Sequence, residues 1–593
     1  MNELKPNDFS DFLAAKHGND IVAKFLFQFR KLNKINKIYS ENSDKQGIEF
    51  IDSVIETLEI NFEFSKEELK RIPLTGSFIT VSNQPLGGLD GLLLLKILHE
   101  VRPDYKLLTN YLLHKIEPLK DFSIPVNNFQ SHQGGSQSFT GIKTSLQHLE
   151  CGKSLGIFPA GEISKAKSMN DISDVEWKPA ILKFVKNAEV PVVPVYFQGN
   201  NSWIYYLLGT LHPLLQTVRF PQELLNKKNK TITIRIGKPI PVNEQNTFTN
   251  LSMYGRFLRA KTYALGTSLE IKKFFNPKFI ARVKKVEKII DPISVDKILP
   301  EINLLKEKYF LFNSSNFSIL CGPSYEIPNV LNEIGRLREI TFREVGEGTN
   351  KSLDLDEFDL YFNHLIVWDN EAQKIAGAYR VGKGDEIMSK FGISGFYIQT
   401  LFKLGKPFYN IMKESLELGR SFIIKEYQKK PLSLFLLWKG LLYFLLKNHE
   451  YRYLIGPASI SNEFSKFSQS LIVEFFTSNY FNNELAKFVK PRKKLKIKKN
   501  PNVDHDVFIK NTGSDLAKLD KFIQDIEPDY TTPVLFKKYI KLNAKLIGFN
   551  VDPKFNDCVD GLMLLDIFDV PINTLKTLSK ELDDESILER FHL

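Results

Sequence analysis

The sequence predicts an α/β protein with two domains, and three patterns lead to this prediction. Residues 77–99 read as an apolar strand that passes through a glycine-rich turn into an apolar helix. Residues 154–161 read as a buried strand that ends in a Pro- and Gly-containing loop. Residues 329–381 read as an amphipathic helix followed by two strands. At 593 residues, the chain is long enough for two domains, each with its own core.

The composition is that of a globular protein with a basic excess. Lys and Arg number 80 against 69 Asp and Glu, which leaves a net charge of +11. This excess suits an anionic partner such as a membrane surface, an acidic carrier protein or nucleic acid. The cysteines Cys151, Cys321 and Cys558 have no metal or disulfide spacing, so we expect a reducing compartment and no metal. The polar amino terminus lacks the order of a signal peptide.

Residues 8–70 read as mostly helical, and the turn at 83–91 then follows the first predicted strand. In this turn Asp90 precedes an apolar helix that runs to His99. A strand, a glycine-rich turn and a helix with an acid at its start are typical of a site at a sheet edge. The alternative is a tight turn in which Asp90 only caps the helix.

Four motifs in order resemble the glycerolipid acyltransferase (PlsC-like) family. They are NQPLGGLD at 83–90, FPAGEIS at 158–164, VPVVPVYFQGNNS at 190–202 and TITIRIGKPI at 231–240. The resemblance is closer to the hemolysin-like bacterial branch that makes acylated amino-acid lipids. It implies a PlsC-like α/β fold, and an acyl donor or lipid bound by the second motif through Phe158, Pro159, Gly161, Glu162 and Ser164. Residues 202–215 would line the acyl groove or touch the membrane, or form a core helix.

The family's chemistry requires a base at one position of the first motif. The resemblance implies a His, oriented by Asp90, that takes the proton of an acceptor hydroxyl, but Gln84 stands at the His position and has no useful basicity. His99 lies roughly 14 Å from Asp90 along the helix. The spacing of His114 and His132 does not aim either of them at the site. The first half is therefore expected to keep the fold, with its catalysis in doubt.

The second half carries seven polar and aromatic positions in an order that resembles the autoinducer-synthase-like branch of the GNAT acyltransferases. Ornithine and glycine lipid N-acyltransferases belong to the same broad group. The positions are Arg338, Phe342, Asp356, Asp359, Arg380, Glu417 and Arg420.

The resemblance implies a GNAT-like fold that transfers an acyl group from acyl carrier protein, or from CoA, to the α-amine of a small acceptor. Glu417 and Arg420 would be catalytic. Asp356 or Asp359 would hold the ammonium of the acceptor, and Arg380 or Arg420 a carboxylate or phosphate. The alternative for Asp359, Arg380 and Arg420 is an internal network that holds a loop to the sheet.

The remaining segments set the domain limits. We expect domain limits at 1–275 and 306–593, with a helical connector at 276–305. The Lys- and Arg-rich stretch 490–499 is a solvated linker, or a surface for anionic lipid or acidic carrier protein; it lacks the aromatic residues that nucleic acid binding favours. Near the end, 533–549 reads as a helix, 549–553 as a turn and 560–566 as a strand.

No apolar segment is long enough to span a bilayer, and 432–446 reads as a core helix or a helix at a bilayer surface. We expect a cytoplasmic enzyme of lipid synthesis, peripheral to the inner membrane, that N-acylates ornithine or glycine with 3-hydroxyacyl groups. Its first half would esterify the 3-hydroxyl. The alternatives are a lysophospholipid acyltransferase, or a first half that binds lipid without catalysis.

Overall fold

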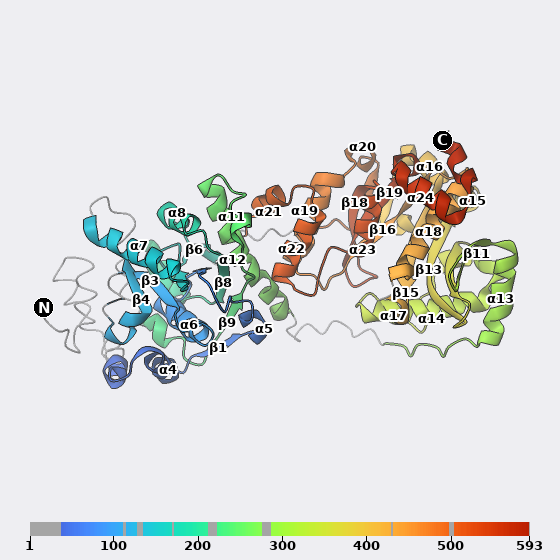
Figure 1. Cartoon of the computed structure of the whole chain (residues 1–593). Helices are drawn as coiled ribbons and strands as arrows, with labels where there is room; N and C mark the ends of the chain where they lie inside the picture. Colours follow the sequence, from blue (N-terminus) through green and yellow to red (C-terminus); the bar gives the residue numbers. More distant parts are fainter. Residues whose placement is uncertain are drawn as a thin grey trace. The chain divides into compact units, whose positions relative to one another are not determined.

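The structure is a computed structural model, and it describes residues 37–110, 114, 116–126, 135–168, 171–211, 222–274, 286–428, 431–496 and 503–591. The chain forms two compact units (Figure 1). Unit 1 comprises Met1–Phe275 and Lys499–Asn511, so a short segment from late in the sequence belongs to the first unit. Unit 2 comprises Asn276–Lys498 and Thr512–Leu593.

Unit 1 is built on a seven-stranded sheet in the order β1-β9-β8-β2-β5-β3-β4, parallel except for the β8–β9 pair. The strands are β1 (Asn61–Phe64), β2 (Ile79–Ser82), β3 (Lys106–Asn110), β4 (Ser123–Val126), β5 (Leu155–Ile157), β8 (Val192–Gln198) and β9 (Thr231–Ile236), with a separate hairpin of β6 (Lys165–Ser168) and β7 (Asp171–Ser173). The helices are α4 (Gly47–Thr57), α5 (Lys66–Leu69), α6 (Gly88–His99), η2 (Glu117–Phe122), α7 (Gly135–Glu150), α8 (Pro179–Asn187), α9 (Trp203–Leu211), α11 (Val242–Gln245), α12 (Leu251–Phe274) and α21 (His505–Thr512).

Strand β8 shows how the sheet of unit 1 is covered on both faces. Val193, Val195 and Phe197 belong to the core that α4 and α6 complete. The alternate residue Tyr196 faces α12, where Gly266 leaves room for its ring. Because both faces are covered, the strand is a nearly continuous apolar run, as buried strands are.

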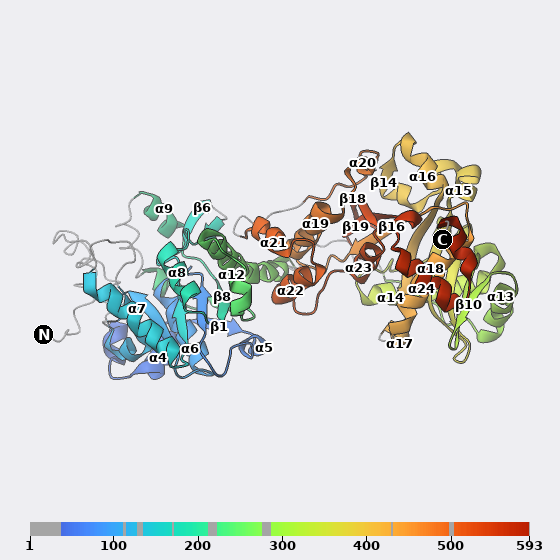
Figure 2. The same cartoon turned by 45° about the horizontal axis from the view of Figure 1, so that its top comes forward.

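Unit 2 is built on an eight-stranded sheet in the order β10-β11-β12-β13-β15-β16-β19-β18 (Figure 2). Its strands are β10 (Phe310–Ser314), β11 (Phe317–Pro323), β12 (Asn363–Asp369), β13 (Lys374–Lys383), β15 (Ser415–Ile423), β16 (Tyr453–Ile460), β18 (Lys545–Asp552) and β19 (Cys558–Asp566), with a small sheet of β14 (Phe402–Leu404) and β17 (Val489–Pro491). The helices are α13 (Val295–Lys308), η3 (Ser324–Glu326), α14 (Pro328–Glu344), η4 (Glu357–Leu360), α15 (Gly384–Phe391), η5 (Gly392–Gly395), η6 (Tyr397–Thr400), η7 (Lys406–Phe408), α16 (Tyr409–Lys413), α17 (Lys425–Gln428), α18 (Pro431–Lys447), α19 (Lys466–Tyr480), α20 (Asn483–Ala486), α22 (Leu516–Ile526), α23 (Val534–Lys541), η8 (Ile567–Asp569), α24 (Ile572–Leu582) and η9 (Glu585–Phe591).

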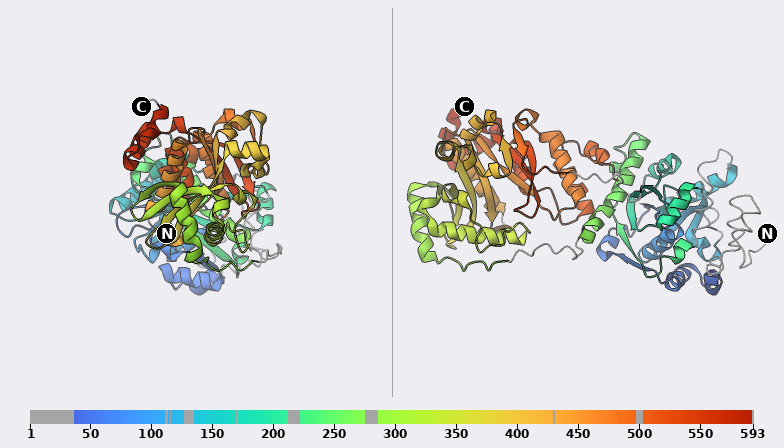
Figure 3. Two further views of the ribbon diagram at one scale, coloured as in Figure 1. Left: turned by 90° about the vertical axis from the view of Figure 1, so that its right-hand side faces the viewer. Right: turned by 180° about the vertical axis from the view of Figure 1, so that it is seen from behind.

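One row of apolar side chains crosses four strands of this sheet. Leu320, Ile366, Ala378 and Phe422 are paired in register from β11 to β15 and share a core with α13 and α14. The opposite face of the sheet packs against α18, where Gly440 lies close to Ile319 and Leu365. Unit 2 therefore has three layers, which the views in Figure 3 show from other sides.

Two strands at the centre of unit 2 separate soon after they meet. The parallel pairing of β15 with β16 covers only Ser415–Glu417 and Tyr453–Ile455, although both strands continue. Beyond Glu417, β15 also carries an irregularity in its register with β13, opposite Ala378–Arg380. The sheet is thus opened beside the positions that the sequence analysis singled out.

The structure departs from the predicted secondary structure in two regions. Residues 61–64 form an edge strand inside a region predicted as mostly helical, of which residues 8–36 lie outside the described part. The predicted helix 533–549 ends at Lys541, and β18 occupies 545–552, so 549–553 is mostly strand and not a turn. Asn543 explains the break, because its φ of 64° is left-handed and ends the helix.

Helix α18, predicted as a core or surface helix, lies on the sheet and buries Leu436, Leu437 and Leu441. Among the residues that the structure describes, no helix has both the length and the hydropathy needed to cross a membrane. The predicted connector is described from residue 286, and α13 begins at Val295 and packs against α14 and β11 of unit 2.

Candidate active sites in the two units

The first candidate site surrounds the turn between β2 and α6. Gly87, with φ 79°, occupies the position before the helix, and Asp90 is the third helical residue. The Asp90 side chain does not take the N-cap position; its Oδ2 accepts a hydrogen bond from Leu86 N at 2.8 Å. Asp90 is fully buried, and no donor in the described chain reaches its Oδ1.

Asp174, which the sequence analysis missed, joins the first two motifs. Its Oδ1 accepts from Gln84 N at 3.2 Å and from Ser164 Oγ at 2.6 Å, and its Oδ2 accepts from Trp177 Nε1 at 3.1 Å. Ser164 N in turn donates to Gln84 O at 2.9 Å. Ser164 is therefore held inside the protein as part of the framework of the turn.

The other predicted binding residues form a tight turn after β5. Gly161 has φ 67° and donates its N–H to Phe158 O at 3.0 Å, while Pro159 O accepts from Lys178 N at 3.1 Å. The Phe158 ring lies 6.5 Å from the ring of Phe197, and Glu162 forms an exposed ion pair with Lys165 at 2.8 Å. These contacts fix the backbone of the loop and leave Glu162 at its surface.

Burial shifts the pKa of both carboxyl groups in this site. It raises the pKa of Asp90 well above its usual range, and it raises the pKa of Asp174 despite the hydrogen bonds from Ser164 and Gln84. The Gln84 side chain donates from Nε2 to Gly87 O at 3.5 Å. The amide of this side chain is not a base.

Three described histidines of unit 1, His99, His114 and His148, have other neighbours. The His99 ring lies 5.2 Å from the Phe122 ring, and His114 Nδ1 lies 2.7 Å from Ser123 Oγ. His148 Nε2 lies 3.0 Å from Ser154 O. His132 falls outside the described residues.

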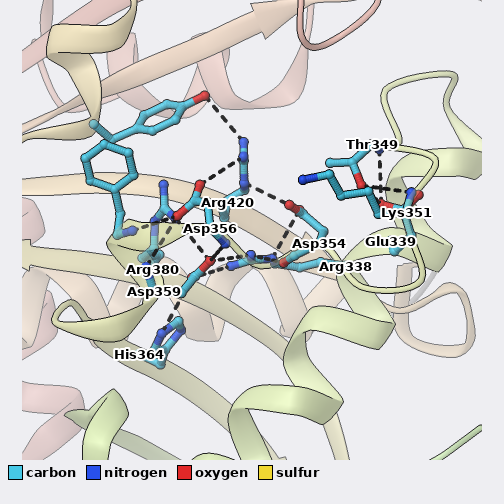
Figure 4. A network of polar contacts seen from close by, with 12 residues as sticks. Arg338, Glu339, Thr349, Lys351, Asp354, Asp356, Asp359, His364, Arg380 and Arg420 are labelled. Carbon is cyan, nitrogen blue, oxygen red and sulfur yellow. Dashed lines mark hydrogen bonds and ion pairs between the residues drawn. The ribbon is translucent and has the colours of Figure 1, made fainter. Parts of the chain in front are cut away.

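The second candidate site is a buried network of arginine and aspartate in unit 2 (Figure 4). Arg338 forms two hydrogen bonds of 2.9 Å with the carboxylate of Asp359, and its Nε lies 3.2 Å from Asp354 Oδ2. Each of these side chains is at most 2% exposed. Although burial opposes ionisation, Arg338 and Arg380 hold the pKa of Asp359 far below its usual range.

Asp356 connects two further arginines to this network. Arg380 Nη1 lies 2.5 Å from Asp356 Oδ1, and Arg420 Nη2 lies 3.3 Å from Asp356 Oδ2. Asp356 and Asp359 also form a reciprocal capping box at η4. Five of the seven predicted positions, Arg338, Asp356, Asp359, Arg380 and Arg420, thus meet in one network, and the Asp-x-x-Asp segment is not a solvated loop.

Aromatic rings lie against the guanidinium groups of Arg380 and Arg420. The Arg380 guanidinium lies 5.0 Å from the ring centre of Tyr397, and that of Arg420 lies 4.3 Å from the ring of Phe555. Arg420 has φ 55°, in the left-handed region, at the irregular part of β15. Tyr397, Phe555 and Asp354 were missed because none of them belongs to a pattern of spacing in the sequence.

Glu417 and Phe342 contribute to the internal hydrogen bonding and packing of unit 2. The Glu417 carboxylate is fully buried and accepts from Tyr397 N at 3.0 Å and Ile398 N at 2.6 Å, and burial raises its pKa to about 7. Phe342 packs at the margin of the core shared with α13 and α14. Glu417 therefore holds the η6 turn that carries Tyr397 beside Arg420.

Comparisons with known proteins agree with this division into two units. Residues 12–272 match the family model described as "Acyltransferase", and residues 337–439 match the "Acetyltransferase (GNAT) domain". The chain is an acyltransferase with two α/β domains, an acyltransferase domain followed by a GNAT domain.

Two relatives from Phocaeicola vulgatus are each 28% identical to this chain. A "Glycine N(alpha)-acyltransferase" matches over 299 residues, 48% of this chain and 90% of the relative, and a "Lyso-glycine lipid O-acyltransferase" matches over 251 residues, 41% and 87%. Proteins with the same two names from Bacteroides thetaiotaomicron also match at 28%. The solved structure of the acyltransferase PlsC from Thermotoga maritima aligns at 16% identity, covering 42% of this chain and 87% of that one, with a TM-score of 0.25.

Proposed function

We propose that this chain combines the two acyl transfers that build a doubly acylated amino-acid lipid. Unit 2 would transfer a 3-hydroxyacyl group to the α-amine of glycine or ornithine, and unit 1 would esterify the resulting 3-hydroxyl. The observation that carries the proposal is that one chain matches both an N-acyltransferase and an O-acyltransferase named for glycine lipids. In the relatives these are two separate proteins.

The opened sheet of unit 2 supports N-acyl transfer. A thioester donor needs hydrogen-bond donors for its carbonyl, and the separated edges of β15 and β16 carry backbone groups that do not pair with each other beyond Glu417. Arg420 stands on this part of β15, with Asp356 beside it. An amino-acid acceptor has a carboxylate and an α-ammonium, and this pair of side chains is complementary to both.

The acyl donor is proposed to be acyl carrier protein or CoA, and both are anionic. The described part of the basic stretch exposes Lys490, Arg492, Lys494 and Lys496. The same charges would draw the enzyme to an anionic membrane surface, as a peripheral cytoplasmic protein. Both attractions would weaken with salt.

A second candidate function for unit 1 is lipid binding without turnover. Gln84 favours lipid binding without turnover, because it occupies the position of the first motif at which acyl transfer needs a base. It lies in the same motif as the buried Asp90. In that case the chain would release only mono-acylated amino acid.

The test is the lipid extract of cells that express the full chain. Mass spectrometry should reveal an amino acid carrying one amide-linked 3-hydroxyacyl chain, together with the form that carries an additional ester-linked chain. The mono-acylated form alone would support the lipid-binding role of unit 1. Phospholipid products without an acylated amino acid would contradict the proposal and support a lysophospholipid acyltransferase.

A further inference from the structure

Two buried oxygen atoms beside the turn of unit 1 have no donor in the described chain. They are Asp90 Oδ1 and Asn201 Oδ1, on side chains that are 0% and 4% exposed. Leaving a buried acceptor unsatisfied costs folding free energy, so such atoms call for a ligand or a water molecule. Both side chains are anchored to consecutive residues of one turn, since Leu86 N donates to Asp90 Oδ2 at 2.8 Å and Asn201 Nδ2 donates to Pro85 O at 3.2 Å.

A buried lysine is attached to the same loop. Lys227 is 3% exposed, and its Nζ donates to Asn200 O at 2.6 Å, one residue before Asn201. The charged groups that act on Lys227 are the carboxyls of Glu223 and Asp90 and the ammonium of Lys230. The Glu223 carboxylate is bound by Ser202, through N at 2.8 Å and Oγ at 2.6 Å.

We propose that Lys227 is the proton acceptor of unit 1, in the role left open by Gln84, and that Asp90 and Asn201 bind the acceptor hydroxyl. The inference rests on the proposed O-acyl transfer of this unit. A hydroxyl group supplies the donor that these oxygens lack: its one proton is donated to one of them when the acceptor binds, and it passes to the Lys227 amine in the transfer step. Lys227 has three N–H donors when charged, and one N–H is committed to Asn200.

The charge state of the lysine is compatible with this role. Burial lowers the pKa of Lys227 to about 8, so a substantial fraction of the amine is neutral near pH 8. The carboxyl group of Asp174 is already engaged, because its two oxygens accept hydrogen bonds from Ser164, Gln84 and Trp177.

The proposed step balances without a further reactant. The neutral Lys227 amine takes the proton of the acceptor hydroxyl as its oxygen forms a C–O bond with the thioester carbonyl. The C–S bond then breaks, and the thiolate that leaves takes the proton from the Lys227 ammonium. The products are an ester and a free thiol, and Lys227 is neutral again.

The experiment uses the full chain, an N-(3-hydroxyacyl)glycine acceptor and a long-chain acyl thioester of CoA or carrier protein. Lys227→Arg keeps the positive charge but removes the neutral form, because guanidinium stays protonated. We expect its kcat for ester formation to fall roughly 10²–10⁴-fold, with little change in KM for the acceptor. The matched control is Lys228→Arg, since Lys228 is exposed and paired with Glu59; it should retain wild-type turnover.

The pH profile separates a base from a structural cation. Ester formation by the wild type should rise with an apparent pKa near 8, and Gln84→His combined with Lys227→Arg should restore turnover with a profile shifted toward the usual pKa of about 6.5 for His. Turnover retained by Lys227→Arg, or a flat wild-type profile between pH 6.5 and 9, would overturn the role of Lys227. A wild type that forms no ester even at pH 9 would instead refute the O-acyl transfer itself.

Discussion

Asp356 bridges two arginines from neighbouring strands, with Oδ1 at 2.5 Å from Arg380 Nη1 and Oδ2 at 3.3 Å from Arg420 Nη2. It is also the most accessible carboxylate of the network, at 19% exposure against 2% or less for Asp354 and Asp359. An acceptor molecule that approaches the network from solvent therefore meets Asp356 before the other two carboxylates.

The first prediction is that Asp356→Asn lowers N-acylation by at least about 10²-fold, because the variant loses the charge that orients both guanidiniums and attracts an ammonium. The measurement is mono-acylated amino acid formed per minute. Glu357→Gln is the matched control, since the adjacent carboxylate is exposed and should be dispensable. Equal activity of Asp356→Asn and the control would remove Asp356 from the site.

The second prediction concerns the contribution of Arg338 to the stability of the fold. Arg338→Met should lower the free energy of unfolding by about 3–5 kcal/mol, because it leaves Asp354 and Asp359 buried with fewer counter-charges. Lys374→Met breaks an exposed pair with Glu426 and should cost less than about 1 kcal/mol. Chemical denaturation measures both. A cost for Arg338→Met as small as that of the control would mean that the network contributes little to stability.

How far the sequence predicts this molecule depends on where each partner lies in the chain. Strands such as β12 and β13 were predictable, because alternation and apolar runs record burial locally. The signature positions Arg338 and Asp359 were found because they fall in an ordered pattern, although their pairing is set by tertiary contact. The end of α23 was missed, and Asn543 was the available signal for it.

Other site residues have no local signature. Asp174 lies 90 positions from Gln84, and only the fold brings its carboxylate to that backbone N–H. Lys227 reads as one of many lysines in a polar segment, and its burial is what sets it apart from Lys228. The unusual pKa of such a group comes from its surroundings, and a sequence does not record those surroundings in one place.

The third prediction concerns the basic stretch. Lys490→Gln with Lys494→Gln should raise KM for the acyl carrier protein, or weaken binding to vesicles of anionic lipid, and the effect should shrink as salt rises from 50 to about 500 mM. The control removes the same charge elsewhere on unit 2, through Lys576→Gln with Lys580→Gln on the exposed side of α24. If both pairs behave alike at every ionic strength, only net charge matters.

The last prediction follows from Glu417, whose pKa burial raises to about 7 in the folded protein, against 4.5 for the ordinary group. The folded state therefore binds more protons than the unfolded state between these two values, so stability should fall as pH rises from about 4.5 to 7 and level off above 7. A shift of this size corresponds to at most roughly 3 kcal/mol.

Glu417→Gln cannot ionise, and its amide loses one acceptor for Tyr397 N and Ile398 N, which is a cost that pH does not change. The difference in unfolding free energy between wild type and variant, measured by chemical denaturation at pH 5, 6, 7 and 8, should thus move in favour of the variant as pH rises. A difference that stays constant over this range would show that Glu417 is ionised throughout, held by the two backbone N–H groups and by Arg380.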